Sequence, residues 1–205
     1  MNILGYEGVL GMEQSKAGAR DNPDHRATLP FTRMLAGPMD YTPGAFRNVT
    51  REEFQPRLAS PVVVGTRAQQ LAMYVVYQAA LQMVADTPQA YAGQPEFEFI
   101  RDVPATWDET RVVGGRPGEY AAIARRHSTE WFLGSLTNWS PRQLDLALDF
   151  LESGNYTAEI YSDADDAARH PSMVRVERKN VNRNQHLMAR LAPGGGYAVR
   201  FVPTP

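Results

Sequence analysis

The chain contains no cysteine, which excludes disulfide bridges and thiolate metal sites among its 205 residues. It also lacks any apolar run near the roughly 20 residues that span a bilayer, so no membrane-spanning helix is expected. The formal net charge is only −2, which gives no basic footprint for nucleic acid. The first residues, MNILGYEG, have neither a basic stretch nor a long apolar stretch, so we expect no export signal there.

The composition that remains, 43% hydrophobic and 21% charged, is typical of an ordinary globular chain. Its length allows one large domain or two small ones. The pattern changes near Gly93-Gln94-Pro95, where helical periodicity gives way to short alternating runs. We therefore predict two domains, residues 1–95 and residues 96–205.

The first half predicts one long helix, from about Arg67 to Ala85. Thr66 is a plausible N-cap, and Gln69 follows three residues later as a capping box requires. Apolar residues occupy most of the helix surface, so burial on most sides is expected. The helix is predicted to end before Pro88, because the residue preceding a proline disfavours the α region.

The second half predicts antiparallel β structure. Glycine-containing segments at 114–115, 153–155 and 194–196 are interpreted as turns between strands. About six or seven short strands in such a stretch are typical of a β-sandwich. The predicted strands are residues 119–126, 131–137, 143–151, 156–163, 173–179, 186–191 and 197–202.

Two glutamates near the N-terminus, Glu7 and Glu13, are the first candidates for chemistry. Cleavage of a glycosidic bond needs a carboxylic acid that protonates the leaving oxygen and a second carboxylate as base or nucleophile. Glycines at 5, 8 and 11 would allow close backbone approach. Two glutamates at this spacing are a weak signal, however, and both could be solvated surface residues.

A loop rich in proline and glycine, GPMDYTPG, supplies Asp40 and Tyr41. These side chains could bind sugar hydroxyls, or the aspartate could close the turn; the sequence does not separate the two interpretations. His25 could reach the same site or could be structural. Trp107 is interpreted as a core or interdomain packing residue. Trp131 and Trp139 also favour packing, although either could stack on a sugar ring.

Four segments in this order resemble glycoside hydrolase family 97, which contains bacterial α-glucosidases and α-galactosidases. They are YEGVLGMEQSK, NPDHRATLPFTRMLAGPMDYTPG, GTRAQQLAMYVVYQAALQMVADTP and FIRDVPATWDETRVVGGRPGEYAAIARR. The resemblance runs from residue 2 to about residue 126 and continues loosely to the end. It implies that residues 1–95 are the C-terminal part of a (β/α)8 TIM barrel and that residues 96–205 are an antiparallel β-sandwich.

The resemblance also implies a site. Glu13 matches the general acid of the family, and Glu7 matches a calcium-binding glutamate, with the carboxylate of Glu13 at or near the calcium. Asp40 and Tyr41 would line the sugar pocket at the barrel loops, where barrel active sites lie. The substrate would be an oligosaccharide with a terminal α-linked glucose or galactose. Such proteins are periplasmic or extracellular, and the sandwich could mediate homo-oligomerisation.

The catalytic base or nucleophile of the family would lie upstream of Glu7. Inverting and retaining mechanisms, and glucose and galactose specificity, are therefore left open. For the same reason we expect the isolated chain to lack hydrolytic activity. The alternative is a non-catalytic protein that uses its sandwich for carbohydrate binding or subunit association.

Overall fold

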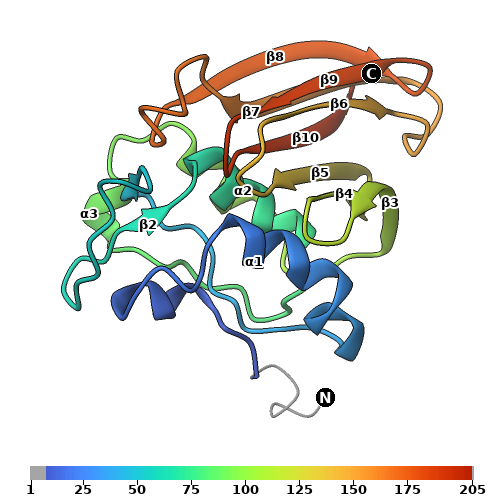
Figure 1. The fold of residues 1–205 in the computed structure, drawn as a ribbon. Coiled ribbons are helices and arrows are strands. Elements are labelled where there is room, and N and C mark those ends of the chain that lie inside the picture. The colour runs from blue at the N-terminus through green and yellow to red at the C-terminus, as the bar shows by residue number, and fades with distance from the viewer. Residues whose placement is uncertain (1–7, 205) are drawn as a thin grey trace.

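The computed structural model describes residues 8–204, and most of its second half is antiparallel sheet (Figure 1). Among the described residues, a six-stranded sheet has the order β3-β4-β5-β10-β7-β8, and β6 pairs with β9 in a separate two-stranded sheet. The strand bounds are β3 Glu109–Arg116, β4 Tyr120–His127, β5 Glu130–Thr137, β6 Arg142–Ala147, β7 Asn155–Asp163, β8 Val174–Asn182, β9 His186–Leu191 and β10 Gly196–Thr204.

The β6–β9 sheet packs on one face of the six-stranded sheet and encloses the first hydrophobic core. Successive side chains of a strand point to opposite faces, so Trp131 and Leu133 of β5 enter this core while Phe132 packs on the other side. Leu187 and Ala189 contribute from β9. This arrangement confirms the predicted β-sandwich.

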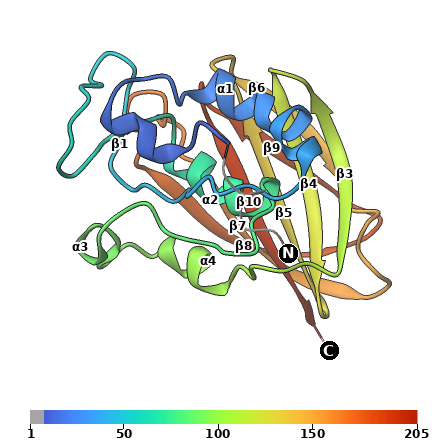
Figure 2. The same cartoon turned by 90° about the horizontal axis from the view of Figure 1, so that it is seen from below.

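Helix α2 (Arg67–Val76) covers the opposite face of the large sheet, and all its residues are buried. Figure 2, seen from below, shows the helices in front of the sheet. Two glycines allow α2 to approach the sheet closely. A Cβ on Gly134 would lie 2.5 Å from the carbonyl oxygen of Ala72, and one on Gly196 would lie 2.3 Å from the Cα of Gln69.

The first hundred residues add short elements around α2. The strands β1 (Asn48–Val49) and β2 (Val63–Val64) form a parallel pair. The helical segments are η2 Met12–Lys16, α1 Pro23–Thr28, η3 Leu29–Phe31, η4 Arg33–Ala36, α3 Pro88–Tyr91 and α4 Phe97–Asp102.

The two predicted domains share hydrophobic clusters. Met73 and Val76 of α2 pack with Ala121, Ile123 and Leu136 of the sheet. The cluster therefore draws residues from both sides of position 95. The division at residues 95 and 96 stays a prediction.

The prediction that the helix continues to Ala85 is wrong, because α2 ends at Val76. The buried guanidinium of Arg125 explains the stop: its Nε donates to the carbonyl oxygen of Val75 at 2.6 Å, and its Nη2 to that of Val76 at 3.4 Å. Tyr77 is then extended, with φ −89° and ψ 142°. Pro88 accordingly begins α3 and does not end a long helix.

The predicted start of the helix is confirmed, since the hydroxyl of Thr66 accepts the N–H of Gln69 at 3.1 Å. The side chain of Gln69 does not complete a capping box. Its Nε2 donates to the carbonyl oxygen of Thr137 at 2.8 Å, and its Oε1 accepts from Arg26 at 2.9 Å. A tertiary contact therefore replaces the local bond.

Two strand predictions also need correction. The segment Gly114-Gly115 is not a turn: it lies inside β3, next to a bulge between Val112 and Gly114. A Cβ on Gly115 would lie 2.7 Å from the ring of Phe31, which explains the glycine there by close packing. The strand predicted to reach Leu151 ends at Ala147. Residues 148–151 form a turn, although their leucines are buried as alternation suggested.

Asp163, at the end of β7, fastens the turn that joins β9 to β10. Its Oδ2 accepts the N–H groups of Ala192 at 2.8 Å and Gly196 at 3.1 Å. The residue is partly exposed, but its Oδ1 is a buried oxygen without a partner in the described part of the chain. Burial raises the pKa of Asp163 to about 6, and hydrogen bonds from Thr66, Ala192 and Gly196 oppose this shift.

Gly134→Ala should destabilise the fold, because the added methyl group meets the backbone of α2. Overpacking of this kind costs about 1–3 kcal/mol, measurable by urea unfolding. Gly114→Ala is the matched control, since its Cβ would make an ordinary contact of 3.6 Å with Tyr120. Equal stability of the two variants would contradict the close approach of α2 to the sheet.

Asp163→Asn should remove a pH-dependent part of the stability. The pKa in the folded state is about 6, against about 3.9 for an unfolded aspartate. The folded state therefore binds the proton more tightly, and this group's contribution is full below pH 4 and falls as the pH rises to about 7. The free energy of unfolding of the wild type minus that of the variant should fall by up to about 3 kcal/mol between these limits. A difference independent of pH would show that this carboxyl titrates normally.

Candidate active-site rim

Glu13 lies on the short helix η2 and is exposed, while its neighbours Met12 and Ser15 are buried and anchor the turn. The backbone N–H of Met12 donates to the carbonyl oxygen of Tyr41 at 3.0 Å. A Cβ on Gly11 would lie 3.0 Å from that oxygen and 3.4 Å from the carbonyl oxygen of Asp40. The Glu13 segment therefore packs against the Asp40-Tyr41 loop, and the roles predicted for these residues stay predictions.

The side chain of Asp40 is exposed beside this contact. Its Oδ1 accepts a hydrogen bond from the hydroxyl of Thr42 at 3.0 Å. Thr42 has a φ of 57°, a backbone conformation that favours glycine and that this bond helps to hold. Asp40 thus closes a turn. Its carboxylate is exposed, and its binding of sugar stays a prediction.

Tyr41 points inward, with 1% of its surface exposed. Its hydroxyl donates to Oδ1 of Asp21 at 2.5 Å and accepts from Nε of Arg26 at 3.1 Å. The ring meets that of Tyr77 edge to face, with 4.7 Å between the centroids. In this structure Tyr41 supports the loop from below, and a contact with sugar stays a prediction.

Arg26 is the centre of this buried network. Its Nη2 lies 2.8 Å from Oδ2 of Asp21, and both side chains are fully buried. Its Nη1 donates to the carbonyl oxygen of Val64 at 2.6 Å and to Oε1 of Gln69 at 2.9 Å. One guanidinium therefore links the loop, β2 and α2.

The protonation states in this network follow from burial and charge. Burial alone would lower the pKa of Arg26, but the charge and hydrogen bond of Asp21, together with Tyr41 and Tyr77, outweigh it and the pKa is raised. Burial raises the pKa of Tyr41 well above its ordinary value, and the positive charge of Arg26 opposes that shift only in part. Arg26 is therefore charged, and the Tyr41 hydroxyl keeps its proton as a donor.

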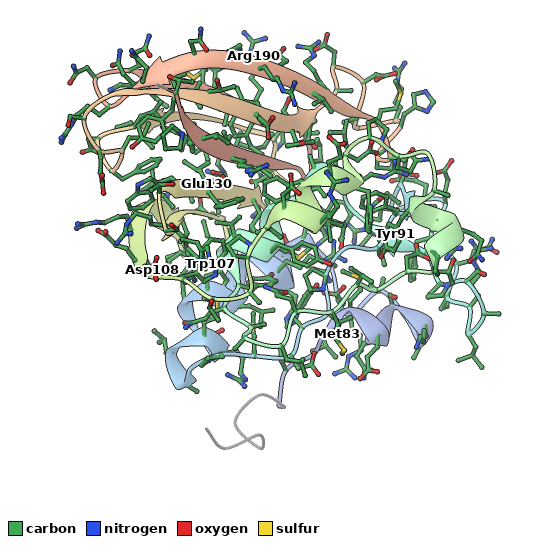
Figure 3. The ribbon with its side chains drawn as sticks, turned by 180° about the vertical axis from the view of Figure 1, so that it is seen from behind. Met83, Tyr91, Trp107, Asp108, Glu130 and Arg190 are labelled. Carbon is green, nitrogen blue, oxygen red and sulfur yellow. The ribbon has the colours of Figure 1, made fainter. Side chains whose placement is uncertain are left out.

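A hollow of about 200 Å³ lies beside Glu13. Apolar side chains form much of its wall, including Val63 of β2 and the exposed Met83. Figure 3 shows Met83 on the side of the molecule opposite Arg190 of β9. The remaining lining residues are Met12, Ser15, Lys16, Thr42, Ala45, Pro61, Val84 and Ala85.

The predicted calcium site is described only in part. Glu7 lies outside the described residues, so the pairing of Glu7 with Glu13 is untested. Within residues 8–204 no group of three or more histidine, aspartate or glutamate side chains is arranged to hold a metal. Calcium takes about six to eight oxygen ligands, so Glu13 alone does not form such a site.

The other sequence candidates have structural contacts. His25 places its Nε2 2.8 Å from the carbonyl oxygen of Leu10. Trp107 packs edge to face on Phe132, and Trp131 lies in the sandwich core. The guanidinium of Arg51 lies over the ring of Trp139, 5.5 Å from the ring centroid.

Sequence reasoning missed Asp21 and Arg26. They lie five residues apart and resemble ordinary surface charges in the sequence. The Asn22-Pro23 pair between them is a local signal for the start of a helix. Asn22 caps α1 by accepting from the N–H groups of Asp24 and His25. That cap fixes where α1 begins, but the burial of Arg26 depends on contacts with distant residues.

None of the helices in the described residues is long and apolar enough to cross a membrane.

Comparisons with known proteins agree with a sheet domain at the C-terminal end of a carbohydrate-active enzyme. Residues 106–202 match the family model described as "Glycosyl-hydrolase 97 C-terminal, oligomerisation". A retaining alpha-galactosidase of Bacteroides thetaiotaomicron is 38% identical over 203 residues, covering 98% of this chain and 31% of the relative. A probable retaining alpha-galactosidase of Streptomyces bingchenggensis is 36% identical over 176 residues, covering 85% of this chain and 25% of the relative.

Solved structures give the same picture. A glycoside hydrolase family 97 enzyme from Pseudoalteromonas sp. strain K8, in complex with acarbose, superposes with a TM-score of 0.85 at 34% identity, over 95% of this chain and 31% of that chain. The crystal structure of a beta-arabinopyranosidase superposes with a TM-score of 0.69 at 26% identity, over 87% of this chain and 27% of that chain. The chain spans about a third of the length of the first of these relatives. It belongs to glycoside hydrolase family 97 and corresponds to the C-terminal portion of its members.

Tyr41→Phe should weaken the support of the loop, because it removes one acceptor from Arg26 and one donor to Asp21. Arg26 and Asp21 stay bonded to each other, so the expected cost is that of losing hydrogen bonds to charged groups, about 1.5–3 kcal/mol, which urea unfolding would report. Tyr120→Phe, at a half-buried position, is the matched control. If the two variants unfold at the same urea concentration, the Tyr41 hydroxyl contributes nothing to stability.

Proposed function

We propose that this chain forms part of an exo-acting glycosidase that removes a terminal α-linked sugar from oligosaccharides. The observation that supports this most is the identity of 38% over 203 residues to a retaining alpha-galactosidase. It extends far beyond the family-model match at residues 106–202 and includes the Glu13 and Asp40 segments. The names of both curated relatives favour galactose over glucose and a retaining mechanism.

The proposal includes the architecture inferred from the resemblance. Residues 1–95 would supply the last units of a (β/α)8 barrel. The parallel pair β1–β2 followed by α2 is the order that such a unit requires. Residues 96–205 would be the sandwich domain, and the description of the family model supports its association with a second copy.

Glu13 is proposed as the general acid. The turn η2 fixes its backbone through the bond from Met12 to Tyr41, while the carboxyl itself stays exposed at the hollow. A carboxylic acid there can deliver its proton to the glycosidic oxygen as the bond to the anomeric carbon breaks. In a retaining enzyme the same group then accepts a proton from the water that completes hydrolysis.

Asp40 is proposed as a sugar-binding residue, and its backbone lies against Gly11, two residues before Glu13. Its carboxylate can accept hydrogen bonds from two sugar hydroxyls. Tyr41, whose hydroxyl is held by Asp21 and Arg26, would position that loop for substrate. Calcium at Glu7 and Glu13 is part of the proposal, and no step above depends on it. Localisation in the periplasm or outside the cell rests on the resemblance.

Glu13→Gln in the full-length enzyme tests the acid. General acid catalysis contributes about 10²–10⁴-fold, so kcat/KM on melibiose, which has a poor leaving group, should fall by that factor. On a dinitrophenyl α-galactoside, whose leaving group needs no proton, the loss should be much smaller. Comparable losses on both substrates would contradict the assignment. Glu52→Gln, at an exposed position in the loop between β1 and β2, should change neither rate.

A further inference from the structure

A larger hollow, of about 600 Å³, opens at one end of the sandwich. Its volume lies in the range of small-molecule binding sites. Figure 3 labels Asp108 and Glu130, the sequence neighbours of the lining residues Glu109 and Trp131. The lining residues are Glu109, Arg111, Val112, Val113, Trp131, Ala147, Asp149, Phe150, Leu151, Glu152 and Arg183.

The strand register explains why these side chains meet. Glu109 of β3 and Trp131 of β5 both pair with Arg126, the residue between them on β4. Paired residues point to the same face, so all three project toward the β6–β9 side. On that face β4 continues with the small residues Ala122 and Ala124, which leaves space beside the loop that joins β6 to β7.

Aromatic and polar groups converge in this hollow. Phe150 is half-buried, with its ring centroid 5.1 Å from that of Trp131. The indole Nε1 of Trp131 is a buried donor that has no hydrogen-bond partner among the described residues. Asp149 and Glu152 place exposed carboxylates at the opening. The hollow therefore offers an apolar surface and two strong acceptors, and its wall contains a buried donor without a partner among the described residues.

The charges restrict the ligand. Glu109 is neutralised by Arg111 at 2.5 Å and by Arg126 at 3.4 Å, which leaves the acceptors at Asp149 and Glu152. Arg183 also lines the hollow, with its Nη2 donating to the carbonyl oxygen of Asp149 at 3.4 Å. The three acidic side chains of the lining still outnumber the two arginines, which disfavours an anionic ligand. A metal ion does not fit either, because residues 8–204 contain no suitable group of three ligands. A neutral molecule with many hydroxyls matches best, since carboxylates accept from hydroxyls and its C–H faces can pack on Phe150.

We propose that this hollow is a second carbohydrate site, which binds a neutral oligosaccharide apart from the Glu13 rim. The six-stranded sheet separates the two: Trp131 lies in the core on the β6–β9 side, whereas Met12, next to Glu13, lies in the cluster on the α2 side. The site holds substrate chains without reacting with them. It does not depend on the role of Glu13.

Nuclear magnetic resonance titration of the 205-residue chain with melibiose and with maltotriose tests the site. The indole N–H signals are assigned with Trp107→Phe and Trp139→Phe, and that of Trp131 should shift with a Kd on the order of 1–10 mM. Asp149→Asn and Phe150→Ala should each weaken binding at least fivefold. Asp165→Asn, an exposed aspartate between β7 and β8, should not change it.

Three outcomes would overturn the proposal. The Trp131 signal could stay unchanged at about 100 mM sugar, or it could shift equally in Asp149→Asn. It could also shift with protein concentration and not with sugar, which would make the hollow an interface between copies of the chain. In the full-length enzyme, Asp149→Asn should leave turnover of an aryl α-galactoside unchanged. This turnover measurement distinguishes loss of the second site from loss of catalysis.

Discussion

The buried guanidinium of Arg26 is the interaction on which the N-terminal half of the structure depends. A charge taken out of water is tolerated only when it is paired and hydrogen-bonded, and Arg26 meets this condition through Asp21, Tyr41, Val64 and Gln69. These partners come from different segments. Their bonds can form together only when the loop, β2 and α2 are already in place, so the network selects one arrangement of these segments.

The same network ties the rim to the sandwich. Gln69 accepts from Arg26 with one end of its amide and donates to the carbonyl oxygen of Thr137 on β5 with the other. Helix α2 is itself held against the sheet at Gly134 and Gly196. A displacement of the sheet would therefore move α2, and through Arg26 it would move the Tyr41 loop. This coupling gives the sandwich a structural reason to affect the geometry around Glu13.

The sequence predicted what local periodicity can encode. Alternation located seven of the strands, and the Thr66 cap located the start of α2. Periodicity did not predict the end of α2, because a residue distant in sequence determines it. Arg125 of β4 caps the helix after Val76, although the apolar pattern continues to residue 85. The strand β3 was missed because Gly114 and Gly115 suggested a turn, whereas Phe31 occupies the space that a side chain would need.

In the candidate site, too, some features could be predicted and others depend on contacts between distant residues. The resemblance placed Glu13 beside the Asp40 loop, and the backbone contacts of Met12 and Gly11 bring these segments together. Nothing in the local pattern indicated that Tyr41 faces inward, since its burial depends on Asp21 and Arg26. That inward orientation has a consequence for chemistry. Because backbone bonds and a buried network fix the rim, the carboxyl group of Asp40 makes only its local bond to Thr42, and those of Glu13 and Asp40 both stay exposed to a ligand.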